Sequence, residues 1–235
     1  MQKWLVSVAI LALAFMAVGE AQRGGAPGGG RGGAPGGARG GRGAAPRAIA
    51  GHGVEVPGWW ARLDNVKEPA TGLKFAPMGG GFHATTGPNI IFWDPQQTAM
   101  GQYVVKAIFT VTKQPSHEVS YGLFIGGANL DQDSQRYSYF LIRENGQFLV
   151  KKRTGATTSN VAGDWAPNPA IVALAGGTQK NEMSVQVGGG TVSFMVNGKE
   201  VANHPAASID TDGIVGLRVG HGMDIQIDGF AIERK

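Results

Sequence analysis

Cysteine is absent from the 235-residue chain. This absence excludes a disulfide framework, a thiolate metal site and a lipid anchor on an N-terminal cysteine. Beyond the first 21 residues, no apolar run is long enough to span a bilayer. Amphipathic helices are also missing, because Pro167 and Pro169 interrupt the single candidate, residues 166–175.

The first 21 residues have the pattern of a secretion signal. Lys3 supplies a positive charge, an apolar run covers residues 4–18, and Gly19 and Ala21 are small residues at the −3 and −1 positions of a cleavage site. A retained membrane anchor is the alternative, but the run is shorter than the roughly 20 residues that cross a bilayer. We expect a signal peptide at 1–21 and a mature protein, without a membrane span, that is secreted, periplasmic or on the cell surface.

Residues 22–50 are rich in glycine, alanine, proline and arginine. They contain three related units of eight residues, RGGAPGGG, RGGAPGGA and RGGRGAAP, with five arginines and no acidic residue. Such a segment has no large apolar side chains to offset its conformational entropy, so a disordered linker is expected. A spacer is the simplest role, and adhesion to anionic cell-surface polymers is a second. RNA binding is disfavoured by export and by the lack of interleaved aromatic residues.

Residues 51–235 are expected to form one folded domain of nearly neutral charge. They carry 15 basic and 16 acidic side chains, a formal charge of −1. The basic character of the whole chain therefore comes from the linker. A neutral domain provides no electrostatic footprint for nucleic acid, so no nucleic-acid partner is expected.

The domain has the pattern of β-strands throughout. Short runs of β-branched and aromatic residues recur at roughly ten-residue spacing between turn residues, which is typical of sandwiches and barrels. Within 102–112 every second residue is apolar. Asn145-Gly146 and Asn197-Gly198 predict hairpins, because Asn-Gly favours the positive φ values of a type I′ turn. Further strands and turns are expected at 183–187, 188–190, 213–219 and 224–232.

Two segments carry a family resemblance: FMVNGKEV at 194–201 and the closing DIQIDGFAIE at 224–233. With the order of the strands, they make residues 59–235 similar to the concanavalin A-like lectin/glucanase superfamily, in particular to laminin-G-like bacterial domains and the 3-keto-disaccharide hydrolase domain family. The resemblance implies an all-β fold, a two-sheet antiparallel jelly-roll sandwich with ligands at its concave face or rim. It specifies the fold better than the chemistry.

Aromatic rings beside planar polar groups are the residue types that hold sugars. The strand 137–143 alternates, placing Tyr139 and Arg143 on the face opposite Phe140 and Ile142, which suit the core. The same residues would also fit a solvated outer face with cross-strand pairs. The candidate ligand-binding residues are Tyr139, Arg143, Arg153, Arg218 and Trp165.

Three tryptophans of the domain are assigned to faces. Trp59 and Trp60 are adjacent, so on a strand they point to opposite faces and only one of them is buried. Trp93 ends an apolar run and is expected in the core.

Catalytic and metal-binding motifs are weak. No Glu-x-Asp-x-x-Glu strand of a retaining glycosidase is present. The resemblance implies an enzyme acting on 3-keto-disaccharides, which would need one base and a metal at most. His83, His221 and Asp224 are the candidate catalytic residues. Asp131 and Asp133 form an Asp-x-Asp loop of the kind that calcium prefers, without an obvious third carboxylate.

Three functions remain open. The first is an exported carbohydrate-binding module that uses the concave face and has a carbohydrate or cell-surface polysaccharide as its partner. The second is a glycoside-processing enzyme of the 3-keto-disaccharide hydrolase type. The third is a structural surface or matrix protein that self-associates through exposed strand edges.

Overall fold

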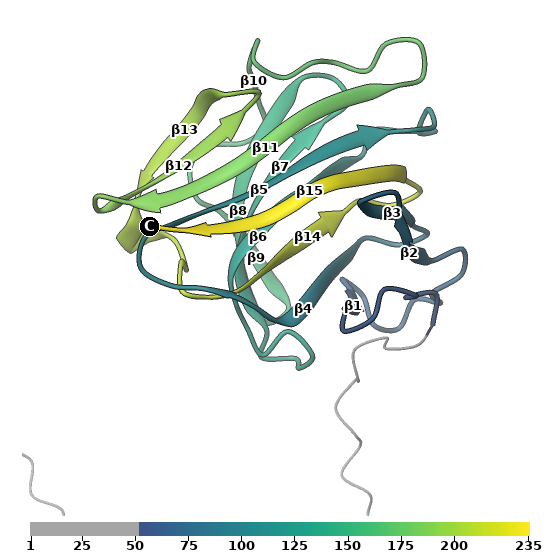
Figure 1. Cartoon of the computed structure of the whole chain (residues 1–235), viewed down its shortest axis with the longest axis horizontal. Coiled ribbons are helices and arrows are strands. Elements are labelled where there is room, and N and C mark those ends of the chain that lie inside the picture. The colour runs from purple at the N-terminus through teal and green to yellow at the C-terminus, as the bar shows by residue number, and fades with distance from the viewer. Residues whose placement is uncertain (1–51) are drawn as a thin grey trace, which may run out of the picture. The chain divides into compact units, whose positions relative to one another are not determined.

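The computed structural model describes residues 52–235, which form an all-β sandwich of two antiparallel sheets. Figure 1 shows the two sheets stacked face to face, with the C-terminal strand β15 in the nearer sheet. The predicted signal peptide (1–21) and linker (22–50) lie outside the described residues. Residues 52–235 contain no helix with the length and apolar character needed to cross a membrane.

Each sheet draws its strands from distant parts of the sequence. The eight-stranded sheet has the order β1 (Trp60–Leu63), β4 (Ile90–Ala99), β14 (Gly213–Val219), β6 (Ser120–Ala128), β7 (Arg136–Arg143), β8 (Gln147–Thr154) and β10 (Ala166–Pro167), and β9 (Thr157–Asn160) also pairs with β8. The seven-stranded sheet has the order β13 (Lys199–Pro205), β12 (Thr191–Val196), β11 (Gln179–Gly188), β5 (Tyr103–Val111), β15 (Asp224–Arg234), β3 (Gly81–Thr85) and β2 (Lys74–Met78). A single 3₁₀ turn, η1 (Ala206–Ser208), is the only helical element of the described residues.

The main core lies between the sheets and follows the alternation predicted from the sequence. Tyr103, Val105, Ala107, Phe109 and Val111 of β5 are all fully buried. They share the core with the inward residues of β14 and β15, so the predicted strands 213–219 and 224–232 are confirmed. The absence of an amphipathic helix is confirmed for residues 52–235.

The two Asn-Gly hairpins differ in their turns. Asn197 and Gly198 have φ values of 50° and 75°, so the predicted type I′ turn is confirmed between β12 and β13. The type I′ prediction is wrong at Asn145-Gly146, where only Gly146 has a positive φ. There the N–H of Gly146 donates to the carbonyl of Arg143, which adds one residue to the loop and needs a left-handed conformation only at the glycine.

A second apolar cluster covers the outer face of the eight-stranded sheet, the face turned away from the other sheet. Most outer faces of sandwiches are polar, yet this one buries large aromatic rings together with charged side chains. The members of the cluster are Ile91, Trp93, Phe124, Leu130, Tyr137, Tyr139 and Leu141.

Candidate functional site

A row of aromatic side chains crosses the outer face of the eight-stranded sheet. Trp60 of β1 lies opposite Trp93 of β4, and the register continues through Gly216 of β14 and Phe124 of β6 to Tyr139 of β7. Gly216 has no Cβ, and a Cβ built there would meet the ring of Phe124 at 2.5 Å. The glycine thus lets Phe124 lie flat over β14. We call Trp60, Trp93, Phe124, Tyr137 and Tyr139 the aromatic floor.

Strand β1 places charged side chains beside this floor. Ala61 and Leu63 are buried in the main core, so their neighbours Trp60 and Arg62 point to the outer face. Asp64 follows at the end of the strand, with its backbone N–H donating to the carbonyl of Asn89. The alternation of one short strand therefore brings a tryptophan, an arginine and an aspartate to the same face.

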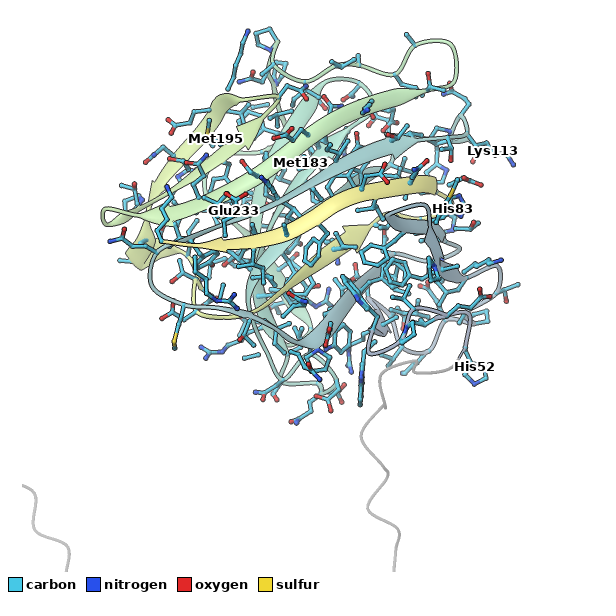
Figure 2. The ribbon with its side chains drawn as sticks, in the orientation of Figure 1. His52, His83, Lys113, Met183, Met195 and Glu233 are labelled. Carbon is cyan, nitrogen blue, oxygen red and sulfur yellow. The ribbon has the colours of Figure 1, made fainter. Side chains whose placement is uncertain are left out.

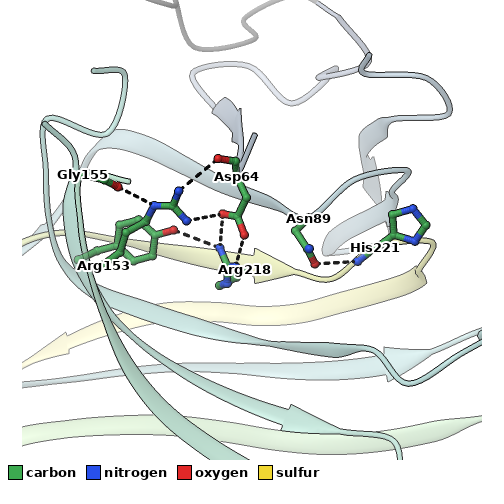
Figure 3. A network of polar contacts seen from close by, with 7 residues as sticks. Asp64, Asn89, Arg153, Gly155, Arg218 and His221 are labelled. Atoms are coloured by element: carbon green, nitrogen blue, oxygen red, sulfur yellow. Dashed lines mark hydrogen bonds and ion pairs between the residues drawn. The ribbon is translucent and has the colours of Figure 1, made fainter. Parts of the chain in front are cut away.

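Asp64 joins two buried arginines. Arg218 of β14 donates to both of its carboxylate oxygens, from Nη1 to Oδ1 at 2.8 Å and from Nη2 to Oδ2 at 2.5 Å. Arg153 of β8 donates from Nη1 to Oδ1 at 3.1 Å, and also to the carbonyls of Asp64 and Gly155. Figure 3 shows the carboxylate between the two guanidinium groups. One carboxylate thus fixes side chains from two strands that are not neighbours in the sheet.

The protonation of Asp64 is controlled by this arrangement. Burial acts to raise the pKa of Asp64, but the hydrogen bonds and charge of Arg218, with the charges of Arg153 and Lys151, outweigh it and lower the pKa below the ordinary value of 3.8. The carboxylate is therefore ionised at neutral pH and acts only as a hydrogen-bond acceptor.

The arginines also lie against the floor. The guanidinium carbon of Arg218 is 4.7 Å from the centre of the Tyr139 ring, and Nη1 donates to the hydroxyl of Tyr137 at 3.1 Å. Burial raises the pKa of Tyr137 to about 12, so its hydroxyl stays neutral. This packing holds the polar groups in one geometry before any ligand arrives.

A cleft opens beside the network. Its volume is about 170 Å³, smaller than the roughly 300–1,000 Å³ typical of pockets for drug-sized ligands, so it suits a single small ring. We call it the Asp64 cleft. Its lining comprises Arg62, Asp64, Asn65, Val66, Lys67, Asp133, Gln135, Arg153, Gly155 and Ala156.

Two of the predicted ligand-binding residues, Arg143 of β7 and Trp165 of the loop before β10, form a pair beside the outer-face cluster, against which Trp165 packs. The guanidinium carbon of Arg143 lies 3.8 Å from the centre of the Trp165 ring. Arg143 also donates to Glu118 at 3.1 Å, and Asn145 donates to the other oxygen of that carboxylate. Arg143 and Trp165 therefore contact each other, whereas Tyr139 contacts Arg218.

The predicted catalytic candidates lie partly together, on the seven-stranded sheet. His83 of β3 donates from Nε2 to Asp224 of β15 at 2.8 Å, and the Thr112 hydroxyl donates to the same carboxylate. Partial burial acts to raise the pKa of Asp224, but the hydrogen bonds from Thr112 and His83 outweigh it and lower the pKa. Figure 2 labels His83 and Lys113 at one end of the molecule, and Lys113 and Asp224 line a cleft of about 290 Å³. His221 makes other contacts: its backbone N–H donates to the side-chain oxygen Oδ1 of Asn89.

The residues predicted for calcium, Asp131 and Asp133, lie in the loop between β6 and β7. Asp133 accepts a hydrogen bond from Arg62 at 2.8 Å on one carboxylate oxygen. Within residues 52–235, no three His, Asp or Glu side chains gather as a metal site. Asp131 and Asp133 thus lack the third carboxylate that calcium would need here.

Chelation of calcium is therefore expected to leave the protein unchanged. Thermal unfolding followed by circular dichroism, with and without excess EDTA, should give the same midpoint. A midpoint that falls on chelation and returns with added calcium would contradict this expectation and restore Asp131 and Asp133 as candidate ligands.

The structure gathers part of the site predicted from the sequence. Tyr139, Arg153 and Arg218 meet around one carboxylate, and Trp60 is the exposed member of the Trp59-Trp60 pair. Trp93 is buried as expected, but on the outer face and not between the sheets. Sequence reasoning missed Arg62 and Asp64, although the alternation of Trp-Ala-Arg-Leu-Asp carried the signal.

No protein-family model and no curated protein matches the sequence. Among solved structures, the domain is similar to the carbohydrate-binding module CBM66 from Bacillus subtilis, with a TM-score of 0.57 and 12% identity over 77% of this chain and 98% of that one. It is also similar to a protein of unknown function with a galectin-like fold from Bacillus subtilis, with a TM-score of 0.54 and 14% identity over 75% of this chain and 89% of that one. At these identities the likeness shows the fold: residues 52–235 form a two-sheet antiparallel jelly-roll sandwich, as the sequence predicts.

Proposed function

We propose that this domain binds carbohydrate at the Asp64 cleft, with the aromatic floor beside it. The observation that carries the proposal is the Asp64 carboxylate held between two buried guanidinium groups, on the outer face that also carries the exposed Trp60. Carboxylates and guanidiniums in fixed positions match pairs of neighbouring sugar hydroxyls, and a tryptophan face suits the C–H side of a sugar ring. The fold shared with a carbohydrate-binding module adds support.

We further propose that binding takes place outside the cytoplasm. The signal-peptide pattern of residues 1–21 and the arginine- and glycine-rich segment 22–50 support export on a linker. Such a linker would let the domain reach a polysaccharide at a distance from the place where the chain is attached or released.

The test is binding of the full chain to a panel of oligosaccharides, including 3-keto-disaccharides. Isothermal titration calorimetry measures binding, and mass spectrometry detects any product. We expect saturable binding without turnover, and at least tenfold weaker binding for Arg153→Met, which removes a hydrogen-bond donor fork from the cleft wall. Glu118→Gln, in the loop before β6 and outside the cleft, is the matched control and should bind as the wild type does. Wild-type affinity in the Arg153 variant would contradict the proposed site.

A second candidate function rests on His83 and Asp224. A histidine hydrogen-bonded at 2.8 Å to a carboxylate is a suitable general base for removing a proton beside a keto group. The same panel addresses it: product formed from a 3-keto-disaccharide, and lost in His83→Gln, would replace binding by catalysis as the function. Product that persists in His83→Gln would exclude this pair as the base.

A further inference from the structure

The Asp64 cleft gathers positive charge on a domain that is otherwise nearly neutral. Residues 51–235 carry a formal charge of −1. At the cleft, by contrast, five cationic side chains face two carboxylates. The cations are Arg62, Lys67 and Arg153 in the lining, Arg218 in the network and Lys151 close enough to act on Asp64, and the carboxylates are Asp64 and Asp133. A local excess of this kind raises the concentration of anionic ligands at the site.

The two carboxylates are held differently. Asp64 is shared by Arg153 and Arg218, so removing it from the site would leave two buried positive charges without a carboxylate partner. Asp133 pairs with Arg62 at 2.8 Å, and this pair is asymmetric: the arginine side chain is 4% exposed and the aspartate side chain 77% exposed. Asp133 can therefore rotate into water at little cost. Arg62, by contrast, stays at the wall of the cleft.

We propose that the sugar bound in the Asp64 cleft carries a carboxylate, so that the ligand class is a uronic-acid-containing polysaccharide. This inference rests on the proposed carbohydrate-binding function. Arg62 binds the ligand carboxylate in the place that Asp133 occupies in the free protein. This position already holds a carboxylate, because Arg62 Nη2 donates to Oδ1 of Asp133 at 2.8 Å, and a ligand carboxylate can make the same contact. The small volume of the cleft matches one uronate residue.

The experiment compares short oligogalacturonates and oligoglucuronates with the same oligosaccharides after reduction of their carboxyl groups. Calorimetry of the full chain gives the affinities at low and high salt. The five arginines of residues 22–50 are present in every variant, so their attraction for an anionic ligand cancels between variants, although not between uronates and reduced analogues. The comparison of variants is therefore the readout that belongs to the cleft. We expect the uronates to bind at least tenfold more tightly than their reduced analogues, with a difference that shrinks as salt rises. A neutral oligosaccharide bearing a sulfate ester should bind less tightly than the uronate.

Asp133→Asn is the decisive variant, because it removes the competing charge but keeps a side-chain oxygen of the same shape that can still accept a hydrogen bond from Arg62. Removing the competing charge should strengthen uronate binding about two- to fivefold, the range for an exposed ion pair. Affinity for the reduced analogue should not change. Asp131→Asn, with the same change two residues away, is the matched control and should leave both affinities unchanged. An equal gain in the two variants would indicate a general effect of charge and overturn the inference.

The other outcomes separate this inference from the proposed function. Equal binding of uronates and reduced analogues would overturn the acidic ligand and leave carbohydrate binding intact. Weaker uronate binding by Asp133→Asn would mean that Asp133 itself contacts the ligand. It would overturn the proposal that the ligand carboxylate displaces Asp133 from Arg62. Tighter binding of the sulfated sugar than of the uronate would overturn the assignment of a carboxylate as the ligand group that Arg62 binds. No binding of any sugar in the panel would remove the proposed function itself.

Discussion

Replacing Asp64 by alanine is expected to lower the free energy of unfolding by about 3–5 kcal/mol, among the largest effects of any substitution at the site. Arg218 and Arg153 are 8% and 7% exposed, and within residues 52–235 Asp64 is the only carboxylate that pairs with either. Without it, two guanidinium groups remain buried and unpaired. Chemical denaturation followed by fluorescence measures the loss.

The matched control is Glu118→Ala. Glu118 also pairs with an arginine of the eight-stranded sheet, Arg143 at 3.1 Å, but its side chain is 61% exposed. An exposed ion pair contributes about 1 kcal/mol or less, so this variant should be close to the wild type. Equal losses of unfolding free energy in the two variants would show that the stabilisation by Asp64 does not come from the burial of its arginine partners. In Arg218→Met, removal of the buried cation should cost less than removal of Asp64 does, because the longer apolar chain fills the space without leaving a charge unpaired.

The Asp64 network also predicts the response to acid. The pKa of Asp64 is lowered in the folded protein, so its contribution to stability is present above the unfolded value near 3.8 and is lost as pH falls through the folded pKa. Wild-type unfolding free energy should therefore fall below about pH 4, and Asp64→Asn should flatten that part of the curve. A variant that keeps the wild-type slope would assign acid sensitivity to other carboxylates.

The sequence was sufficient for the strands that alternate clearly and for their faces. The alternation in β5 and the apolar positions of β14 predict the core because each places every second side chain in the same layer. Turn geometry was less predictable: Asn145-Gly146 and Asn197-Gly198 have the same two residues, yet the number of loop residues differs. That number depends on how the flanking strands pair, which is a tertiary property.

The site was harder to predict than the fold. Arg153 and Arg218 were recognisable as polar residues on otherwise apolar strands, but the residue that unites them is 89 positions from the first and 154 from the second. No local pattern reports such a contact. The burial of most of the aromatic floor on an outer face was also not predictable, because alternation assigns a side chain to a face without saying what covers that face.

The two facing tryptophans of the floor are expected to separate binding from stability. Trp60 and Trp93 lie opposite each other on β1 and β4 with ring centres 6.4 Å apart, but Trp60 is 37% exposed and Trp93 only 2%. Trp93→Ala opens a cavity under the site and should cost about 3–5 kcal/mol of unfolding free energy. Trp60→Ala removes a ring that water already reaches and should cost about 1–2 kcal/mol.

The same pair tests the role of the exposed indole in recognition. Because Trp60 is 37% exposed and lies on the same face of β1 as Arg62, Trp60→Ala should weaken oligosaccharide binding about 5- to 30-fold, the loss of about 1–2 kcal/mol typical of a stacked aromatic contact. Calorimetry on folded protein gives this ratio, and the fluorescence change on ligand addition should be reduced in Trp60→Phe. Trp60→Ala with wild-type affinity would exclude the indole as a sugar platform. Recognition would then depend on the arginines and Asp64 alone, and a strong dependence of affinity on salt would follow.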